Sequence, residues 1–170
     1  MGEAANKLLI IGLGNPILTD DAIGWRVAAA LREKLRDHAE LAASVEITEA
    51  CLGGLSLAEL MVDYTRVIVI DAIMTRDCVP GTVYTFKLTA LPGTLNTASA
   101  HDTNLATALG TLRRYGGIVP DDEAVDIVAV EAAEVMTFSE TCTPAVEASI
   151  VPATEAVFRL IQASCAENQK

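Results

Sequence analysis

The chain has 170 residues and a formal net charge of −11, from 12 Lys plus Arg against 23 Asp plus Glu. Hydrophobic residues make up 51% of the chain and charged residues 21%, which is typical of a globular protein and excludes a disordered one. So acidic a chain disfavours nucleic acids and anionic membranes as partners, since both are negatively charged. We expect one domain spanning residues 1–170.

The N-terminal segment and the cysteines bear on location. The apolar run in MGEAANKLLIIGLGNP has no Lys/Arg-rich start and ends at Gly12, so it predicts neither a signal peptide nor a membrane span. The four cysteines are scattered, with no close pair that would form a zinc knuckle: Cys51, Cys78, Cys142 and Cys165. We therefore predict a cytoplasmic protein with reduced thiols.

Apolar runs alternate with helical periodicities along the chain. The patterns predict, in order, a strand over 7–11, a helix over 21–35, a strand over 45–49, a short helix over 55–61 and a strand over 66–72. An antiparallel or edge strand over 81–88, a loop over 92–100, a helix over 101–115, a strand over 125–132 and a long helix from about 143 follow. This order predicts a three-layer α/β/α sandwich with a mostly parallel, twisted sheet of about five strands.

Polar residues collect at the ends of these strands. Asp20 and Asp21 follow the first strand, Asp71 ends the third, and His101 follows the fourth by way of the loop. The other histidine, His38, lies among charged residues at the end of the first helix. Ligands of open α/β sheets bind outside the carboxyl ends of the strands, so we expect these side chains to converge. Two carboxylates and one imidazole suit a borderline ion such as Ni²⁺ or Zn²⁺.

Each of these residues has a simpler interpretation. Asp20 or Asp21 is suited to cap the first helix, where the helix dipole favours an acid. Asp71 follows the apolar run VIVI, so it must be paired, coordinated or hydrogen-bonded to loop amides. His101 alone is equally consistent with an ordinary loop or helix residue.

The Gly-x-Gly of GLGNPI does not make a dinucleotide site. It lacks the third glycine of that fingerprint, and Asp20 and Asp21 would repel a pyrophosphate. Glu49 ends the second strand where an acid could hold a ribose, but the phosphate site it would serve is missing. Cys51 has no nearby histidine in the pattern to activate it as a nucleophile.

Four segments resemble signatures of the nickel–iron hydrogenase maturation endopeptidases. These segments are GLGNPILTDDAIG, with Ile17 in place of the usual leucine, VIVIDAIMT, NTASAHDTNLATAL and TFSETCTPAVEASI. The resemblance runs from about residue 7 to residue 160. It departs from the family in EACLGG, where Asp-Gly-Gly-Thr is more frequent, and in VAVEAAEV, which lacks the usual proline.

The resemblance implies a site and an activity. The family's metal ligands fall on Asp21, Asp71 and His101, with Asp20 as a helix-capping or orienting neighbour. The implied reaction removes a short C-terminal peptide from the hydrogenase large-subunit precursor after nickel insertion, with Asp71 or Asp21 assisting as base. The resemblance implies that the precursor presents the nickel. We expect the enzyme to be a monomeric, metal-dependent endopeptidase that uses aspartates, with the precursor as its one partner.

Three other functions compete with this one. GLGNP also opens peptidyl-tRNA hydrolases, but Ile17 stands where their glycine is needed, DDAIGWRV replaces their histidine segment, and the −11 charge opposes tRNA. A noncatalytic nickel-checking chaperone of the same precursor would use the same three ligands. A free-standing hydrolase would hold its own zinc tightly.

Overall fold

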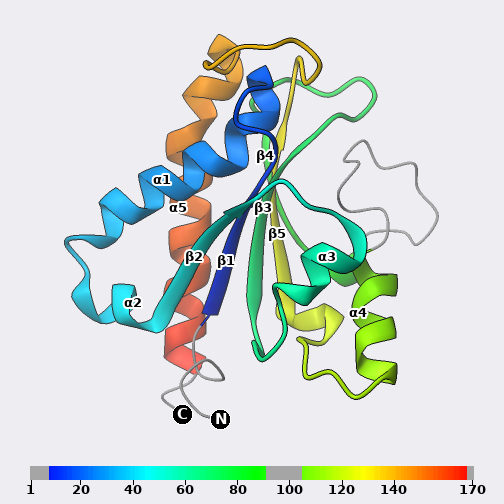
Figure 1. Ribbon diagram of the computed structural model, residues 1–170. Helices are drawn as coiled ribbons and strands as arrows, with labels where there is room; N and C mark the ends of the chain where they lie inside the picture. The colour runs from blue at the N-terminus through cyan, green and yellow to red at the C-terminus, as the bar shows by residue number, and fades with distance from the viewer. Residues whose placement is uncertain (1–7, 91–104, 168–170) are drawn as a thin grey trace.

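A five-stranded sheet forms the middle layer of the protein in the computed structural model, which describes residues 8–90 and 105–167 (Figure 1). The strand order is β2-β1-β3-β5-β4, with β4 antiparallel to β5 at one edge and the other pairs parallel. The strands are β1 (Leu8–Leu13), β2 (Val45–Ala50), β3 (Val67–Ile73), β4 (Val83–Lys87) and β5 (Val125–Glu131). The predicted sheet, including its antiparallel edge strand, is confirmed.

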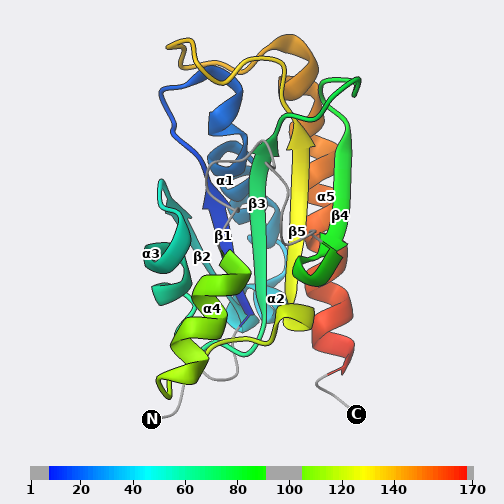
Figure 2. The same cartoon turned by 90° about the vertical axis from the view of Figure 1, so that its right-hand side faces the viewer.

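Helices cover both faces of the sheet, which confirms the three-layer sandwich (Figures 1 and 2). One face carries α1 (Ile23–Leu35) and α5 (Pro144–Glu167), and the other carries α3 (Gly54–Glu59) and α4 (Leu105–Arg114). Short 3₁₀ turns are η2 (Thr19–Ala22), η3 (Leu88–Ala90) and η4 (Asp122–Ala124). In the part of the chain that the structure describes, no helix is both long enough and apolar enough to cross a bilayer.

Strand β1 shows how the sequence builds two cores. Every residue of LLIIGL is buried, as expected for a central parallel strand. Because side chains alternate between faces, Leu8 and Ile10 pack in the α1–α5 core, whereas Leu9 and Ile11 pack in the α3–α4 core. The uninterrupted apolar run therefore serves both layers at once.

Helix α1 crosses the sheet at very close range because its crossing point is glycine. A Cβ atom on Gly24 would lie 2.1 Å from the Leu13 carbonyl oxygen and 2.5 Å from that of Ile70. Opposite it on β1, a Cβ on Gly12 would lie 2.4 Å from the Gly24 carbonyl oxygen. Backbone packs directly on backbone here, so neither position has room for a side chain.

Several boundaries differ from the prediction by a few residues, and one helix was not predicted. Helix α1 begins at Ile23 and not at residue 21, because a 3₁₀ turn precedes it. Strand β3 continues past Asp71, because its pairing with β5 extends to Ile73. Helix α2 (Ala39–Ser44) was not predicted, since none of its six residues is buried and it therefore has no apolar periodicity to detect. The predicted loop over 92–100 lies outside the described residues.

The close crossing predicts opposite effects for one substitution in two helices. Gly24→Ala should lower the free energy of unfolding by about 1–3 kcal/mol, because the methyl group meets fixed backbone atoms. Gly110→Ala in α4 should raise it by about 0.5–1 kcal/mol, because a Cβ there meets nothing within 4 Å and alanine favours the helix. Urea unfolding followed by circular dichroism measures both; equal effects would contradict the close crossing.

Candidate active site

The candidate site lies at the edge of the sheet where the parallel strands end (top of Figure 1). Connections 14–18, 51–53, 74–82 and 132–143 follow β1, β2, β3 and β5 at this carboxyl edge. The 3₁₀ turn η2, which follows β1, packs against β3. Two of the three predicted ligands lie here, Asp21 in η2 and Asp71 in β3.

Asp71 is fully buried at this edge. Its neighbours Ile70 and Ala72 both belong to the α1–α5 core, so the Asp71 side chain points to the opposite face, toward the α3–α4 layer. Its Oδ1 accepts a hydrogen bond of 2.9 Å from the Ala72 amide. The donor belongs to β3 itself and not to a loop, and the catalytic and ligand roles of Asp71 stay predictions.

Asp21 is held by the turn that precedes it. Its Oδ2 accepts a 2.6 Å hydrogen bond from the amide of Asn15, whose own Oδ1 accepts from the Ile17 amide at 3.2 Å. Gly14 has a φ of +123°, and a Cβ there would lie 1.7 Å from the Asp21 carbonyl oxygen. The turn thus folds back onto Asp21 and leaves it half-buried.

Asp20 does not cap α1, so the predicted capping role is wrong for it. Its buried carboxylate instead accepts hydrogen bonds from the amides of Ala133, Glu134 and Thr143, at 2.9, 3.0 and 2.6 Å. The Thr143 hydroxyl donates a fourth bond of 2.9 Å, and the Asp20 amide donates to the Glu134 carbonyl. Neither η2 nor α1 has a side-chain cap. Asp20 therefore fastens η2 to the β5–α5 connection and to the start of α5.

A third buried carboxylate at the edge was missed by the sequence analysis. Glu131 ends β5 and is 2% exposed. It accepts hydrogen bonds from the Thr75 amide at 2.6 Å and from the Thr75 hydroxyl at 2.8 Å. It thereby holds the β3–β4 connection. The acid at the end of an apolar strand was the available signal, the same one that singled out Asp71.

The third predicted ligand, His101, lies outside the described residues. Among residues 8–90 and 105–167, no three His, Cys, Asp or Glu side chains are grouped so that they could hold a metal ion. His38, which was excluded from the site, packs on Phe158 with ring centroids 4.9 Å apart. The described part of the site therefore offers two carboxylates as possible metal donors.

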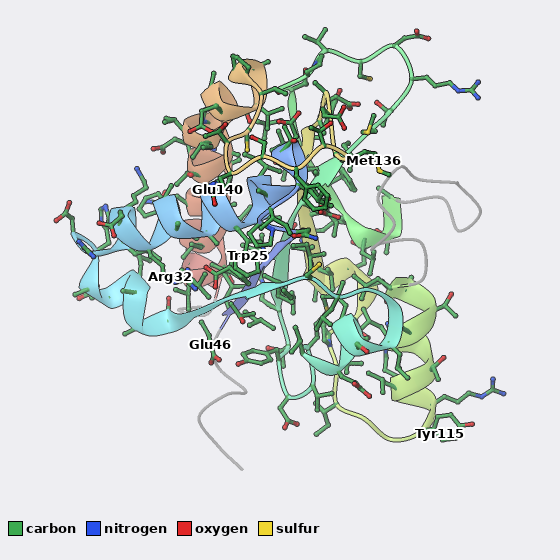
Figure 3. All side chains as sticks on the ribbon, turned by 45° about the horizontal axis from the view of Figure 1, so that its top comes forward. Trp25, Arg32, Glu46, Tyr115, Met136 and Glu140 are labelled. Atoms are coloured by element: carbon green, nitrogen blue, oxygen red, sulfur yellow. The ribbon has the colours of Figure 1, made fainter. Side chains whose placement is uncertain are left out.

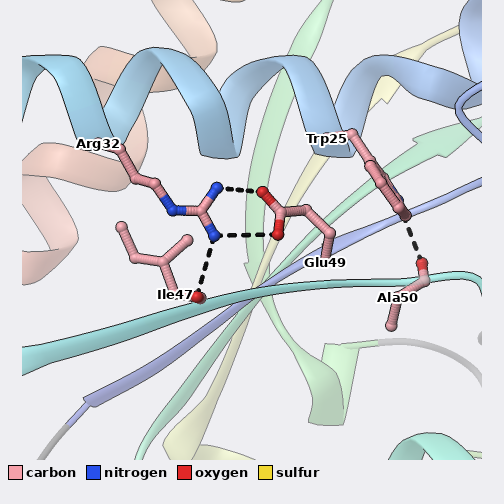
Figure 4. Close-up of polar contacts among 5 residues, drawn as sticks. All are labelled: Trp25, Arg32, Ile47, Glu49 and Ala50. Atoms are coloured by element: carbon pink, nitrogen blue, oxygen red, sulfur yellow. Dashed lines mark hydrogen bonds and ion pairs between the residues drawn. The ribbon is translucent and has the colours of Figure 1, made fainter.

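Glu49, the acid considered as a ribose ligand, forms an ion pair with Arg32 instead. Both terminal nitrogens of the Arg32 guanidinium, on α1, donate hydrogen bonds to the Glu49 carboxylate, one of them at 2.9 Å (Figure 4). This pairing raises the pKa of Arg32. Arg32 also donates to the Ile47 carbonyl, and the Trp25 indole donates to that of Ala50 at 3.4 Å. These contacts tie the exit of β2 to α1.

Three of the four cysteines, Cys51, Cys78 and Cys142, lie on connections of this edge. Burial raises the pKa of the Cys142 thiol to about 11, so it is protonated at neutral pH and is a poor nucleophile. All four thiols are free, which agrees with the expected reduced state.

Comparisons with known proteins identify the family. The profile of the HycI family, described as hydrogenase maturation protease, matches residues 27–160. The chain is 33% identical over 164 residues to the hydrogenase 2 maturation protease of Escherichia coli strain K12, covering 95% of this chain and 94% of that relative. The chain belongs to the hydrogenase maturation protease family. The resemblance found in the sequence signatures is thus confirmed.

Solved structures agree with this assignment. The hydrogenase maturating endopeptidase HybD from Escherichia coli superposes with a TM-score of 0.71 at 29% identity, over 93% of each chain. The nickel–iron hydrogenase maturation protease HybD from Thermococcus kodakarensis gives 0.66 at 23% identity, over 91% of this chain and 99% of that one. The second likeness supports the fold alone.

The Asp20 contacts predict a large loss of stability on truncation. Asp20→Ala should lower the free energy of unfolding by about 3 kcal/mol or more, because three amides and a hydroxyl lose a charged acceptor in a buried place. The exposed Asp37→Ala should change it by less than about 0.5 kcal/mol. Urea unfolding measures both, and similar small effects would show that the buried carboxylate contributes little.

Proposed function

We propose that this maturation protease removes a short C-terminal peptide from the nickel-loaded precursor of a nickel–iron hydrogenase large subunit. The proposal is supported by the relative in Escherichia coli, whose name is hydrogenase 2 maturation protease. One structural observation carries it to this chain: the acids of two family signatures, Asp21 and Asp71, lie at the same edge of the sheet. We place the reaction in the cytoplasm and the active form as a monomer.

The donor set fits a metal that arrives with the substrate. Asp21 and Asp71 supply hard oxygen ligands, and His101 would add a borderline nitrogen, whereas soft thiolates would come from the precursor. Three protein donors leave coordination positions open on the ion, and this open set fits a nickel ion whose other ligands come from the substrate. In this proposal the nickel arrives with the precursor, and its role in recognition is to join the two sets of ligands.

The two carboxylates differ in the work they can do. Asp71 is fully buried, and its Oδ1 accepts a hydrogen bond of 2.9 Å from the Ala72 amide. Asp21 is half-buried and already accepts one short bond from Asn15. We assign Asp71 as the base that takes a proton from the attacking water and Asp21 as an orienting ligand. Substrate-borne nickel would polarise the scissile carbonyl.

The experiment is mass spectrometry of a large-subunit precursor, with and without nickel, after incubation with the protease. We expect loss of a C-terminal peptide from the nickel-loaded precursor alone. Asp71→Asn should slow this loss by about a hundredfold or more, the range of general base catalysis, while the exposed Asp37→Asn should process normally. Unfolding curves of both variants confirm that they are folded.

Equal cleavage of nickel-loaded and nickel-free precursor would refute metal-directed recognition. Binding of the precursor without any mass change would instead identify the protein as a noncatalytic chaperone. Full activity of Asp71→Asn would remove Asp71 from the reaction.

A further inference from the structure

Two distant segments form a small ribbon beside the candidate site. We call residues 17–19 and 137–139 the edge ribbon. Leu18 and Phe138 pair across it as an antiparallel bridge. A backbone hydrogen bond of 3.1 Å and a threonine hydroxyl bond join the same two segments. The next residue, Asp20, accepts bonds from the amides of Ala133 and Glu134, so the segment that leads into the second strand of the ribbon is also tied to η2.

This fixed ribbon displays large apolar side chains to water. Ile17 is 51% exposed, Phe138 is 76% exposed, and the adjacent Met136 is 81% exposed. The neighbouring β3–β4 connection adds Met74 and Val79, which are 40% and 72% exposed. Figure 3 looks toward this edge, with Met136 labelled on the β5–α5 connection. Apolar side chains gathered on one rim, and held there by a buried anion, are typical of a protein interaction surface.

We propose that the edge ribbon and Met136 form the docking surface for the precursor, binding an apolar patch on it that is flanked by basic side chains. This inference rests on the proposed function, because it takes the precursor as the partner. The surface is continuous with the site: Asp20 and Asp21 directly follow the ribbon in sequence, and η2 packs on β3. A precursor seated on the ribbon would therefore present its tail beside Asp71.

The acidic residues beside the edge ribbon indicate what charge the partner's surface carries. The two connections that carry the exposed apolar residues, 74–82 and 132–143, also carry Asp77, Glu134 and Glu140 against one basic residue, Arg76. The amides of Met136 and Thr137 donate to Glu134 and lower its pKa, so it is ionised at neutral pH. These carboxylates complement basic groups at the rim of an interface.

The same charges disfavour a second copy of this chain as the occupant. A two-fold dimer through the ribbon would bring equal surfaces together, so that Glu134 and Glu140 would face the same acids of the partner. Each chain also carries a net charge of −11. The precursor is therefore the occupant to which we commit.

The test is a double substitution with a matched control. Ile17→Ser with Phe138→Ser removes two exposed apolar side chains and keeps the backbone pairing of the ribbon. Ile118→Ser with Val151→Ser removes two side chains of similar exposure, 66% and 69%, outside the edge ribbon and its connections. We expect the first variant to raise KM for precursor cleavage by about tenfold or more with kcat within about twofold, and the control to match wild type.

Each outcome is decisive. Normal KM in the ribbon variant, with active wild type, overturns the docking surface and leaves the protease function. Weakened precursor binding in the ribbon variant, when even wild type does not cleave, supports the surface and overturns the proposed function. Wild type that neither binds nor cleaves overturns both. Light scattering that shows a wild-type dimer, lost only in the ribbon variant, with unchanged cleavage would reassign the surface to a second copy.

Unfolding curves guard against a folding defect. If the double variant is destabilised, the single substitution Met136→Ser replaces it, because that side chain is 81% exposed. It should raise KM by about threefold to tenfold. An unchanged KM in this stable variant would also overturn the docking surface.

Discussion

The buried carboxylate of Asp20 is the interaction on which the carboxyl edge depends. An anion removed from water is costly unless donors surround it, and here three amides and one hydroxyl of the β5–α5 connection do so. The three amides are themselves backbone groups of a loop that would otherwise need water. One side chain thus fixes two connections and the start of α5 at Thr143 relative to each other. Because Asp21 is the next residue, its position follows from the same bonds.

The two adjacent aspartates, Asp20 and Asp21, consequently differ only in their burial and in their hydrogen-bond partners. Asp20 lies under the loop and is saturated with donors, whereas Asp21 lies half-buried on the open side and accepts one described bond from Asn15. Their chemistry is identical, and burial with hydrogen bonding separates a structural acid from one available to a substrate. The glycine at position 14, with its positive φ, allows the turn to close tightly enough for this separation.

The sequence predicted those parts of the molecule that depend on local burial. Strands buried on both faces, such as β1, read as apolar runs, and parallel topology then placed Asp21 and Asp71 at one edge. What the sequence did not predict joins residues far apart. The donors to Asp20 lie 113 to 123 positions away, and no periodicity reports such a pairing. Glu131 ends an apolar strand as Asp71 does, but its partner Thr75 lies 56 positions away and could not be read from the sequence.

A rim held this way has consequences for how a substrate is recognised. Asp20 fixes the connection that follows β5 and Glu131 fixes the connection that follows β3, each through backbone amides. Fixed loops lose little freedom on binding, so more of the interaction free energy is expressed as affinity. They also cannot close around a small ligand. On the proposed docking surface, a fixed rim with exposed apolar side chains and acidic neighbours would therefore favour a large partner whose surface already fits it.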